Sequence, residues 1–382
     1  MHGAIPVQAT FSLPTYPFQP LPKPNGPAPY RFDLSQILSA DDIATIQSAG
    51  AMTIHAVGDT GDYRGTQQDF VSAMMTADAE SLPANAKPAF FYHLGDIVYF
   101  AGDIDKYGDN FYATYQSYPA FIVGISGNHD CQPDDPQDGP VDPNKVPFDG
   151  FVQNFMSTTP EVPGSLKTGA PRTQMNLPNV YWTFTTPYAT ILGLCSNVGE
   201  TEGEIHQDQQ DWFVGELKAA DPNKALLVTV HHPPFSGDVD HSGSSAVEVV
   251  LTNSFKAAGR YPDMVMSGHV HNYQRFTNIV TDAGGITRQI PFIVAGAGGY
   301  TKLGTLHKIG GKYPSVPLTI STDLILEQYN QTDFGFLRLD ISPTKIDGTY
   351  LSAPFGNSST PVGLQTDSFT LNLTNHTVST NA

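Results

Sequence analysis

The sequence predicts an α/β protein with layered sheets, and three observations support this prediction. Five short apolar runs each end in a polar residue, helical patterns lie between several of them, and the last third of the chain is rich in strand patterns. Runs of this length without polar alternation are typical of strands that are buried on both faces. Strands that alternate with helices favour a layered α/β architecture.

The first half of the chain supplies most of the alternating elements. Ser39 followed by Asp42 is a capping-box pattern, which predicts a short helix that ends near Ala49. The five buried strands are predicted at Met52–Val57, Ala89–Leu94, Phe121–Ser126, Ala225–Val230 and Asp263–Ser267. Apolar residues at helical spacing predict helices over Thr66–Ala77, Gln207–Ala220 and Ser245–Ala258.

The remaining segments are an insertion and a run of strands. Residues 132–178 are rich in proline and glycine, so we expect an insertion loop with one short helix near Phe151–Met156. The aromatic stretch Tyr107–Tyr118 is expected to be a packed helix rather than a substrate platform. Further strands are predicted at Tyr181–Thr185, Ala189–Leu194, Phe292–Ala295, Leu324–Gln328, Phe334–Ile341, Lys345–Leu351 and Ser368–Leu373.

We expect one large domain that follows a short arm. Residues 1–32 are rich in proline and predict an extended arm that lies on the surface or is disordered. Residues 33–382 are expected to form a single domain, with core motifs over 52–300 and a β-rich part over 301–382. A length of 382 residues is also compatible with two or three domains.

Composition excludes several classes of partner. The formal net charge is −18 and no local basic patch is visible in the sequence, which argues against nucleic acid and anionic membrane surfaces. No apolar run is long enough to span a membrane, and the N-terminus lacks the pattern of a signal peptide. Cys131 and Cys195 are compatible with one disulfide or with two free thiols.

The candidate site residues all follow predicted strands. In open α/β sheets, ligands bind beyond the carboxyl ends of the strands. Five such ends carry Asp59, Asp96 with Tyr99, Asn128 with His129, His231, and His269 with His271. Carboxylate and phenolate oxygens suit Fe(III), whereas imidazoles and an amide oxygen suit a divalent ion. The set therefore predicts a centre with two metals.

The same motifs carry a family resemblance. Gly58-Asp59-Thr60-Gly61, Gly95-Asp96-Ile97-Val98-Tyr99, Gly127-Asn128-His129-Asp130, Val228-Thr229-Val230-His231 and Gly268-His269-Val270-His271 resemble the five ordered motifs of the purple acid phosphatases. These enzymes belong to the calcineurin-like metallophosphoesterase superfamily. The resemblance covers roughly residues 50–300, and Tyr99 distinguishes this family from its relatives.

The resemblance implies a fold and a set of metal ligands. The fold would be a β-sandwich flanked by helices, in the short single-domain form of the family. Asp59, Tyr99 and His271 would bind Fe(III), while Asp96 would bridge both ions. The divalent ion, Fe, Zn or Mn, would be bound by Asn128, His231 and His269.

The resemblance also suggests which residues contact the substrate. His129 resembles the family's substrate histidine, and His241 resembles a second one in the loop Pro233–Gly243. Asn128 is expected to contact the substrate, and Arg64 is a further candidate for that role or for a surface ion pair. We expect structural roles for three other histidines. His232 would lie beside the metals, and His55 and His93 would lie in the core.

The resulting functional prediction is hydrolysis of phosphate monoesters by metal-bound hydroxide, as in acid phosphatases. A small-molecule phosphate ester is the expected substrate. One alternative is a phosphodiesterase for nucleotide or phospholipid diesters, and another is a non-catalytic protein that binds phosphate or metal. An extracytoplasmic location is expected by analogy with acid phosphatases.

Overall fold

Two β-sheets and six α-helices form the core of the computed structural model. It describes residues 5–8, 18–61, 66–133, 144–161, 172–197, 203–356 and 361–381. The helices are α1 (Ala40–Ala49), α2 (Thr66–Ser81), α3 (Asn128–Cys131), α4 (Asp149–Phe155), α5 (Gln207–Ala219) and α6 (Ser245–Ala258). Two 3-10 turns (Leu34–Gln36 and Ala84–Ala86) and one π turn (Gly108–Tyr112) complete the helical elements. Among the described residues, no helix has both the length and the apolar character needed to cross a membrane.

The first sheet has nine strands and is parallel at its centre. In spatial order they are β1 (Arg31–Asp33), β5 (Trp182–Thr185), β6 (Ala189–Gly193), β7 (Ala225–Thr229), β8 (Met264–Ser267), β10 (Thr287–Ala295), β9 (Tyr273–Thr281), β12 (Leu324–Asn330) and β11 (Leu318–Thr319). The second sheet has seven: β16 (Thr377–Thr380), β15 (Leu364–Asn372), β14 (Lys345–Ala353), β13 (Phe334–Ile341), β2 (Met52–Val57), β3 (Pro88–His93) and β4 (Phe121–Gly124).

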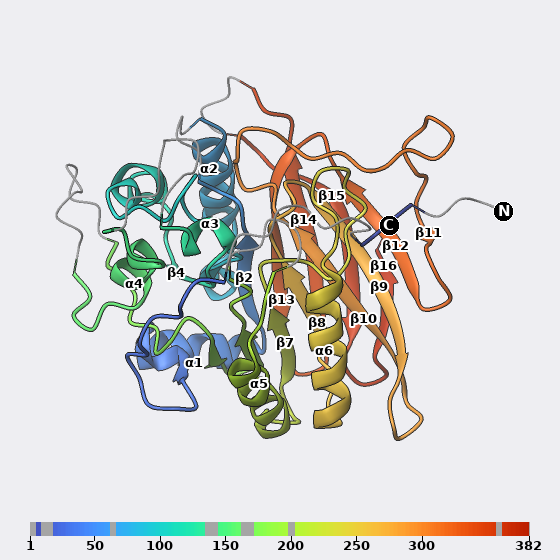
Figure 1. The fold of residues 1–382 in the computed structure, drawn as a ribbon, viewed down its shortest axis with the longest axis horizontal. Coiled ribbons are helices and arrows are strands. Elements are labelled where there is room, and N and C mark those ends of the chain that lie inside the picture. Colours follow the sequence, from blue (N-terminus) through green and yellow to red (C-terminus); the bar gives the residue numbers. More distant parts are fainter. Residues whose placement is uncertain are drawn as a thin grey trace.

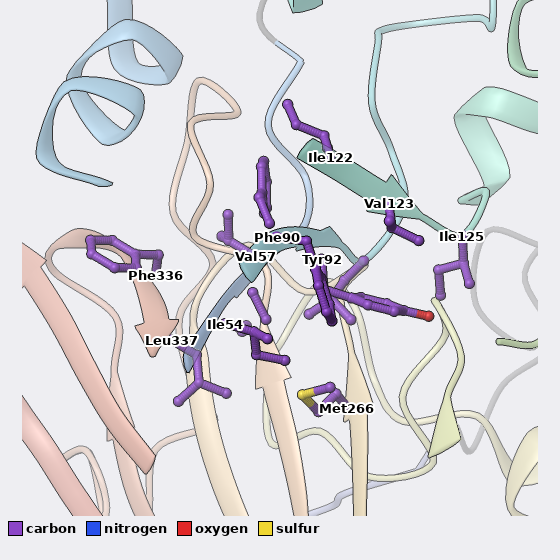
Figure 2. Close-up of a cluster of buried hydrophobic side chains, with 14 of the residues drawn as sticks. Ile54, Val57, Phe90, Tyr92, Ile122, Val123, Ile125, Met266, Phe336 and Leu337 are labelled. Carbon is purple, nitrogen blue, oxygen red and sulfur yellow. The ribbon is translucent and has the colours of Figure 1, made fainter. Parts of the chain in front are cut away.

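The sheets pack face to face with helices on the outside, which confirms the predicted fold class. Met266 of β8 lies beside Tyr92 of β3 in the core between the sheets, and the Tyr92 hydroxyl is 2.6 Å from Thr229 Oγ1 (Figure 2). The other face of the nine-stranded sheet packs on α5 and α6 through a separate apolar cluster that includes Phe213 and Leu251. Figure 1 shows α1–α4 on one side and the strand-rich C-terminal part on the other.

Most predicted elements lie within a few residues of their expected bounds, and the differences have local causes. The strands β1, β9, β11 and β16 were not predicted. Strand β9 lacks a recognisable strand pattern because the polar Gln274 and Arg275 are buried in its first half, whereas the apolar Ile279 and Val280 lie in its more exposed second half. The aromatic side chains of Tyr107–Tyr118 are buried as expected, but the regular element in this stretch is a π turn rather than an α-helix.

Parts of the N-terminal arm contact the domain. Ile5 is buried, and the Val7 carbonyl accepts a hydrogen bond from the Ser236 amide at 3.0 Å. Strand β1 starts at Arg31 and so crosses the boundary that sequence analysis drew at residue 32. Arg31 also forms a two-point ion pair with Glu216 of α5, at 2.7 and 2.8 Å.

Candidate metal centre

Neighbouring strand ends from the two sheets meet at one place. Strands β2, β3 and β4 are parallel neighbours in one sheet, and β7 and β8 are parallel neighbours in the other. Their carboxyl ends therefore point the same way within each sheet. The seven sequence-predicted ligand candidates follow these ends, and all of them are buried: Asp59, Asp96, Tyr99, Asn128, His231, His269 and His271.

Three of these residues have an unusual backbone. Asp59, Asp96 and His269 have φ values of 57°, 54° and 67°, in the left-handed region that non-glycine residues rarely adopt. Such conformations are concentrated at functional sites, where the surrounding fold imposes them. Gly127 is needed for a different reason, because a Cβ there would lie 2.1 Å from Asp96 Oδ1.

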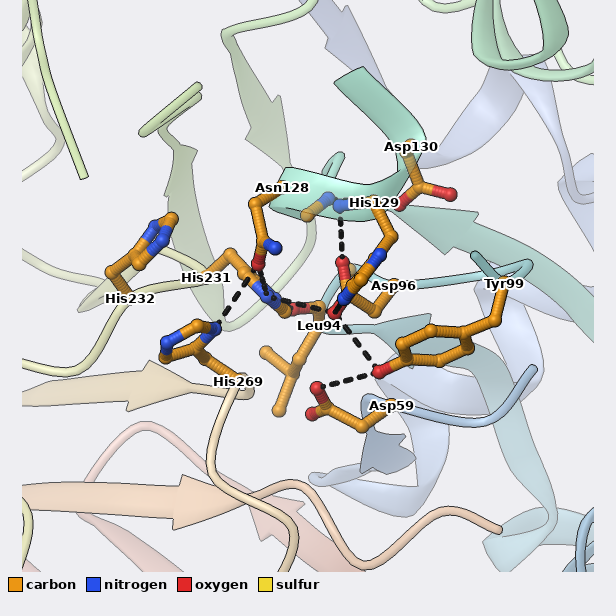
Figure 3. Close-up of polar contacts among 12 residues, drawn as sticks. Asp59, Leu94, Asp96, Tyr99, Asn128, His129, Asp130, His231, His232 and His269 are labelled. Atoms are coloured by element: carbon orange, nitrogen blue, oxygen red, sulfur yellow. Dashed lines mark hydrogen bonds and ion pairs between the residues drawn. The ribbon is translucent and has the colours of Figure 1, made fainter. Parts of the chain in front are cut away.

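One half of the site combines Asp96 with residues from both sheets. His231 Nε2 lies 3.4 Å from Asp96 Oδ2 and 3.1 Å from Asn128 Oδ1 (Figure 3). His269 Nδ1 is also 3.1 Å from Asn128 Oδ1. Ligand atoms of Asp96, His231 and His269 all lie within 4.8 Å of one another, a spacing that can hold a metal ion.

The other half is centred on Tyr99. Its hydroxyl donates to Asp96 Oδ2 at 2.9 Å and lies 3.3 Å from Asp59 Oδ1. His271 Nε2 is 3.4 Å from the same hydroxyl and 3.7 Å from Asp59 Oδ1. Asp96 thus contacts both halves.

The side-chain atoms that converge at this site suit bound cations. His231 Nδ1 donates to the Leu94 carbonyl at 2.8 Å, so in the neutral ring Nε2 is an acceptor. That acceptor faces two oxygen acceptors, Asp96 Oδ2 and Asn128 Oδ1. Asp59 Oδ2 is buried and has no hydrogen-bond partner. A cation between converging acceptors would satisfy all of these atoms.

The pKa shifts of these residues reflect the same excess of buried acceptor atoms. Burial raises the pKa of Asp59 well above its ordinary value, and the charge of Asp96 adds to that effect. Burial opposes ionisation of His231, but the charge of Asp96 outweighs it and raises the pKa of His231 to about 9. Burial, followed by the charges of Asp96 and Asp59, raises the pKa of Tyr99 well above its usual value.

His129 and His241 flank this cluster. His129 Nδ1 donates a hydrogen bond to the Phe100 carbonyl at 2.7 Å, and its Nε2 lies on the side of Asp96, 4.0 Å from Oδ2. The His241 ring lies 4.9 Å from His269 and 5.1 Å from His271, measured between centroids. Arg64 lies outside the described residues.

Three further histidines, His232, His55 and His93, occupy structural positions. His232 Nδ1 is 2.7 Å from Ser196 Oγ, and its ring packs 4.4 Å from that of His269. His55 lies between Asp78 and the Tyr118 hydroxyl at 3.0 and 3.1 Å. His93 Nε2 is 2.8 Å from Thr60 Oγ1. The expected core roles of His55 and His93 are confirmed.

The structure adds residues that sequence analysis did not assign to the site. Asp130 accepts from the Ile97 amide at 3.0 Å and from the Gly127 amide at 2.8 Å, which ties the Asp96 loop to the Asn128 loop. Tyr300 packs 4.3 Å from Tyr99 and 4.4 Å from His271. Asp130 ends a quoted motif, whereas nothing in the sequence around Tyr300 indicates its place.

Asp238 links the His241 loop to a ligand segment. Its Oδ1 accepts from the amides of Asp240 and His241, both at 2.9 Å. Its Oδ2 accepts from Asn272 Nδ2 at 3.0 Å, directly after His271. The loop is thereby held against the site.

Both cysteines are buried free thiols near the Asn128 segment. Cys131 Sγ donates to the Gly127 carbonyl at 2.9 Å, and Ser126 Oγ lies 3.5 Å from Cys195 Sγ. The structure therefore describes the thiol alternative of the two that the sequence left open.

Comparisons with known proteins agree with this geometry. The sequence profile of the calcineurin-like phosphoesterases matches residues 52–273. A stretch of 110 residues is 32% identical to purple acid phosphatase 21 of Arabidopsis thaliana; it covers 26% of this chain and only 23% of that protein.

Solved structures share the fold. PhoD is similar with a TM-score of 0.57 and 13% identity, over 95% of this chain and 73% of PhoD. GAP50, the anchor in the inner membrane complex of Plasmodium, is similar with a TM-score of 0.52 and 12% identity, over 82% of this chain and 88% of GAP50. Identities this low establish similarity of fold alone.

Proposed function

The chain belongs to the calcineurin-like phosphoesterase family, and from that premise we propose that it is a phosphatase that hydrolyses phosphate monoesters at a two-metal centre. The observation that carries the proposal is the convergence of buried acceptors from both sheets at Asp59, Asp96, Asn128 and His231. A surplus of acceptors suits metal cations, and a cationic pocket suits an anionic phosphate.

The proposed metal ligands follow the two halves of the site. Asp59, Tyr99 and His271 would hold Fe(III), and Asn128, His231 and His269 would hold a divalent Fe, Zn or Mn ion. Asp96 contacts residues of both halves and would bridge them. When bound, the two ions would polarise the phosphoryl oxygens and lower the pKa of a water molecule.

His129 and His241 would contact the substrate. His129 is oriented by the Phe100 carbonyl, and His241 is held by Asp238 through the backbone of its loop. An imidazole at these positions is suited to donate a proton to the leaving oxygen or to stabilise its negative charge. Asn128 and Arg64 remain proposed substrate contacts as well.

The test is an assay of metal-loaded protein with 4-nitrophenyl phosphate and bis(4-nitrophenyl) phosphate at equal concentration. We expect faster turnover of the monoester, and activity that disappears with chelation and returns with metal. Faster turnover of the diester would favour the phosphodiesterase alternative. Two bound metals without turnover of either ester would favour the non-catalytic alternative.

Tyr99 gives a separate test of the iron assignment. Phenolate bound to Fe(III) absorbs visible light, so concentrated protein should be coloured and the variant Tyr99→Phe should lose the band. The variant Tyr300→Phe is the matched control, because it removes a hydroxyl from the adjacent ring. An unchanged band in Tyr99→Phe would contradict the assignment of Tyr99.

We also propose an extracytoplasmic location. The proposal is supported by the acidic composition and by analogy with acid phosphatases. Fractionation of the source cells would test it, because activity confined to the cytoplasmic fraction would contradict it.

A further inference from the structure

A second polar cavity lies at the opposite end of the strands from the candidate metal centre. Its volume is about 330 Å³, and its lining includes Ala225, the first residue of β7, and Asp263, which directly precedes β8. His231 and His269 follow the other ends of these same strands. At about 3.3 Å per residue, the cavity lies roughly 20 Å from the centre along β8.

Basic side chains from separate segments gather around this cavity. They are Lys224, Arg260, Arg288 and His376. The whole chain has 19 lysines and arginines and 37 aspartates and glutamates, so this concentration of basic side chains is unusual. The members are far apart in the sequence and form no basic run there, and the acidic Asp263 lies on the same lining.

Arg288 and His376 already have acidic partners. Arg288 Nε lies 3.2 Å from Asp282 Oδ2, and its Nη1 donates to His376 Nε2 at 2.8 Å. His376 Nε2 is therefore an acceptor, and the Nδ1 proton faces Asp263 Oδ1 at 3.5 Å. Arg288 is thus matched in charge by Asp282, and the Asp263 carboxylate is held by the neutral His376 ring and by the Leu226 amide at 2.8 Å.

Lys224 and Arg260 are different. Lys224 Nζ donates to the Thr186 carbonyl at 2.7 Å, which does not neutralise its charge. Arg260 Nε is buried and has no hydrogen-bond partner. Within the described part of the chain, neither residue forms an ion pair. Asp221 interacts electrostatically with both, but its carboxylate is held by the Asn223 amide at 2.9 Å.

We propose that this cavity is a second anion site, which binds a phosphate group either as inorganic phosphate or on a small polar molecule. A tetrahedral oxyanion needs several donors at once, and Arg260, Lys224 and Asn223 offer them on one lining. The Arg260 guanidinium, which forms no ion pair among the described residues, would gain an anionic partner. The mostly polar lining does not suit an apolar ligand.

The test is calorimetric titration of the metal-loaded protein with inorganic phosphate at low ionic strength. We expect two sites per chain, one of them at the metals. The double variant Lys224→Gln/Arg260→Gln should weaken only the second site, by about 10- to 100-fold, because it removes charged hydrogen bonds. Its turnover should stay unchanged, which also shows that it folds.

The matched control is Lys87→Gln/Lys312→Gln, which removes two exposed charges elsewhere. It should keep both sites. Equal phosphate binding in the two double variants would overturn the proposal, whether or not the protein is a phosphatase. Hydroxymethylphosphonate, which carries one phosphonate group and has no ester bond to hydrolyse, separates the two sources: tighter binding than phosphate at the second site identifies a phosphate carried on a larger group, and weaker binding identifies inorganic phosphate.

Discussion

Two buried clusters of charge in this molecule have opposite balances. Arg275 and Asp367 form a two-point ion pair at 2.6 and 2.9 Å, and the Tyr273 hydroxyl donates to Asp367 at 2.8 Å. One positive group thus meets one negative group. At the candidate metal centre, the two carboxylates of Asp59 and Asp96 are buried together, and Asp59 Oδ2 has no hydrogen-bond partner.

The difference shows how a structural cluster can be told from a ligand site. A buried ion pair whose partners match each other needs nothing from outside the chain. A cluster in which acceptors outnumber donors is stable only with protons or cations that the sequence does not supply. We therefore expect substitutions in the first cluster to change stability, and substitutions in the second to change metal content and activity.

The largest expected effect is that of Asp96→Asn. We expect kcat/KM to fall by about a thousandfold or more, because the proposed bridging ligand positions both metals and each contributes several kcal/mol to catalysis. Metal analysis should show fewer than two ions per chain. Two retained metals would contradict the bridging assignment.

His129→Ala and His241→Ala should have the next largest effect. Each should lower kcat by about 10²- to 10⁴-fold if the imidazole assists departure of the leaving oxygen. Metal content should remain at the level of the unmodified protein, which separates these residues from the ligands. His206→Ala is the control, since this exposed histidine contacts Glu204. A fall in metal content with either variant would move that histidine into the ligand set.

Arg275→Met tests the matched cluster. Because Asp367 would be left buried without its partner, the free energy of unfolding should fall by about 3–5 kcal/mol, as measured in urea. Turnover per folded molecule should not change. The double variant Arg275→Met/Asp367→Leu should recover much of the loss. A loss of metal from Arg275→Met would mean that the two clusters are coupled.

The smallest effect concerns pH. Burial lowers the pKa of His55, and it lowers that of His93 to about 3. Both pKa values lie below the unfolded value near 6.5, so both groups stabilise the fold above pH 6.5. That contribution is lost as the pH falls toward the folded pKa values. His55→Gln should therefore reduce the loss of stability between pH 7 and 4.5. An identical change in the free energy of unfolding between pH 7 and 4.5 in the two proteins, measured with urea, would contradict this.

The sequence predicted what depends on local pattern. Buried runs such as Met52–Val57 and capped helices such as Ala40–Ala49 are set by nearby residues, and the proposed ligands lie in the loops that follow such runs. It did not predict β9, or the approach of Tyr300 to Tyr99. Contacts of this kind, like the gathering of Lys224 and Arg260, depend on the path of the whole chain.

The division of the centre between two sheets has a consequence for assembly. Asp59, Asp96 and Asn128 come from one sheet, and His231, His269 and His271 from the other, so neither sheet alone offers a complete binding site. Metal ions that bind only when the two sheets are in contact stabilise that contact by their binding free energy. Loss of the ions should therefore loosen the contact between the sheets first. Resistance to proteolysis would then report whether a molecule carries its metals.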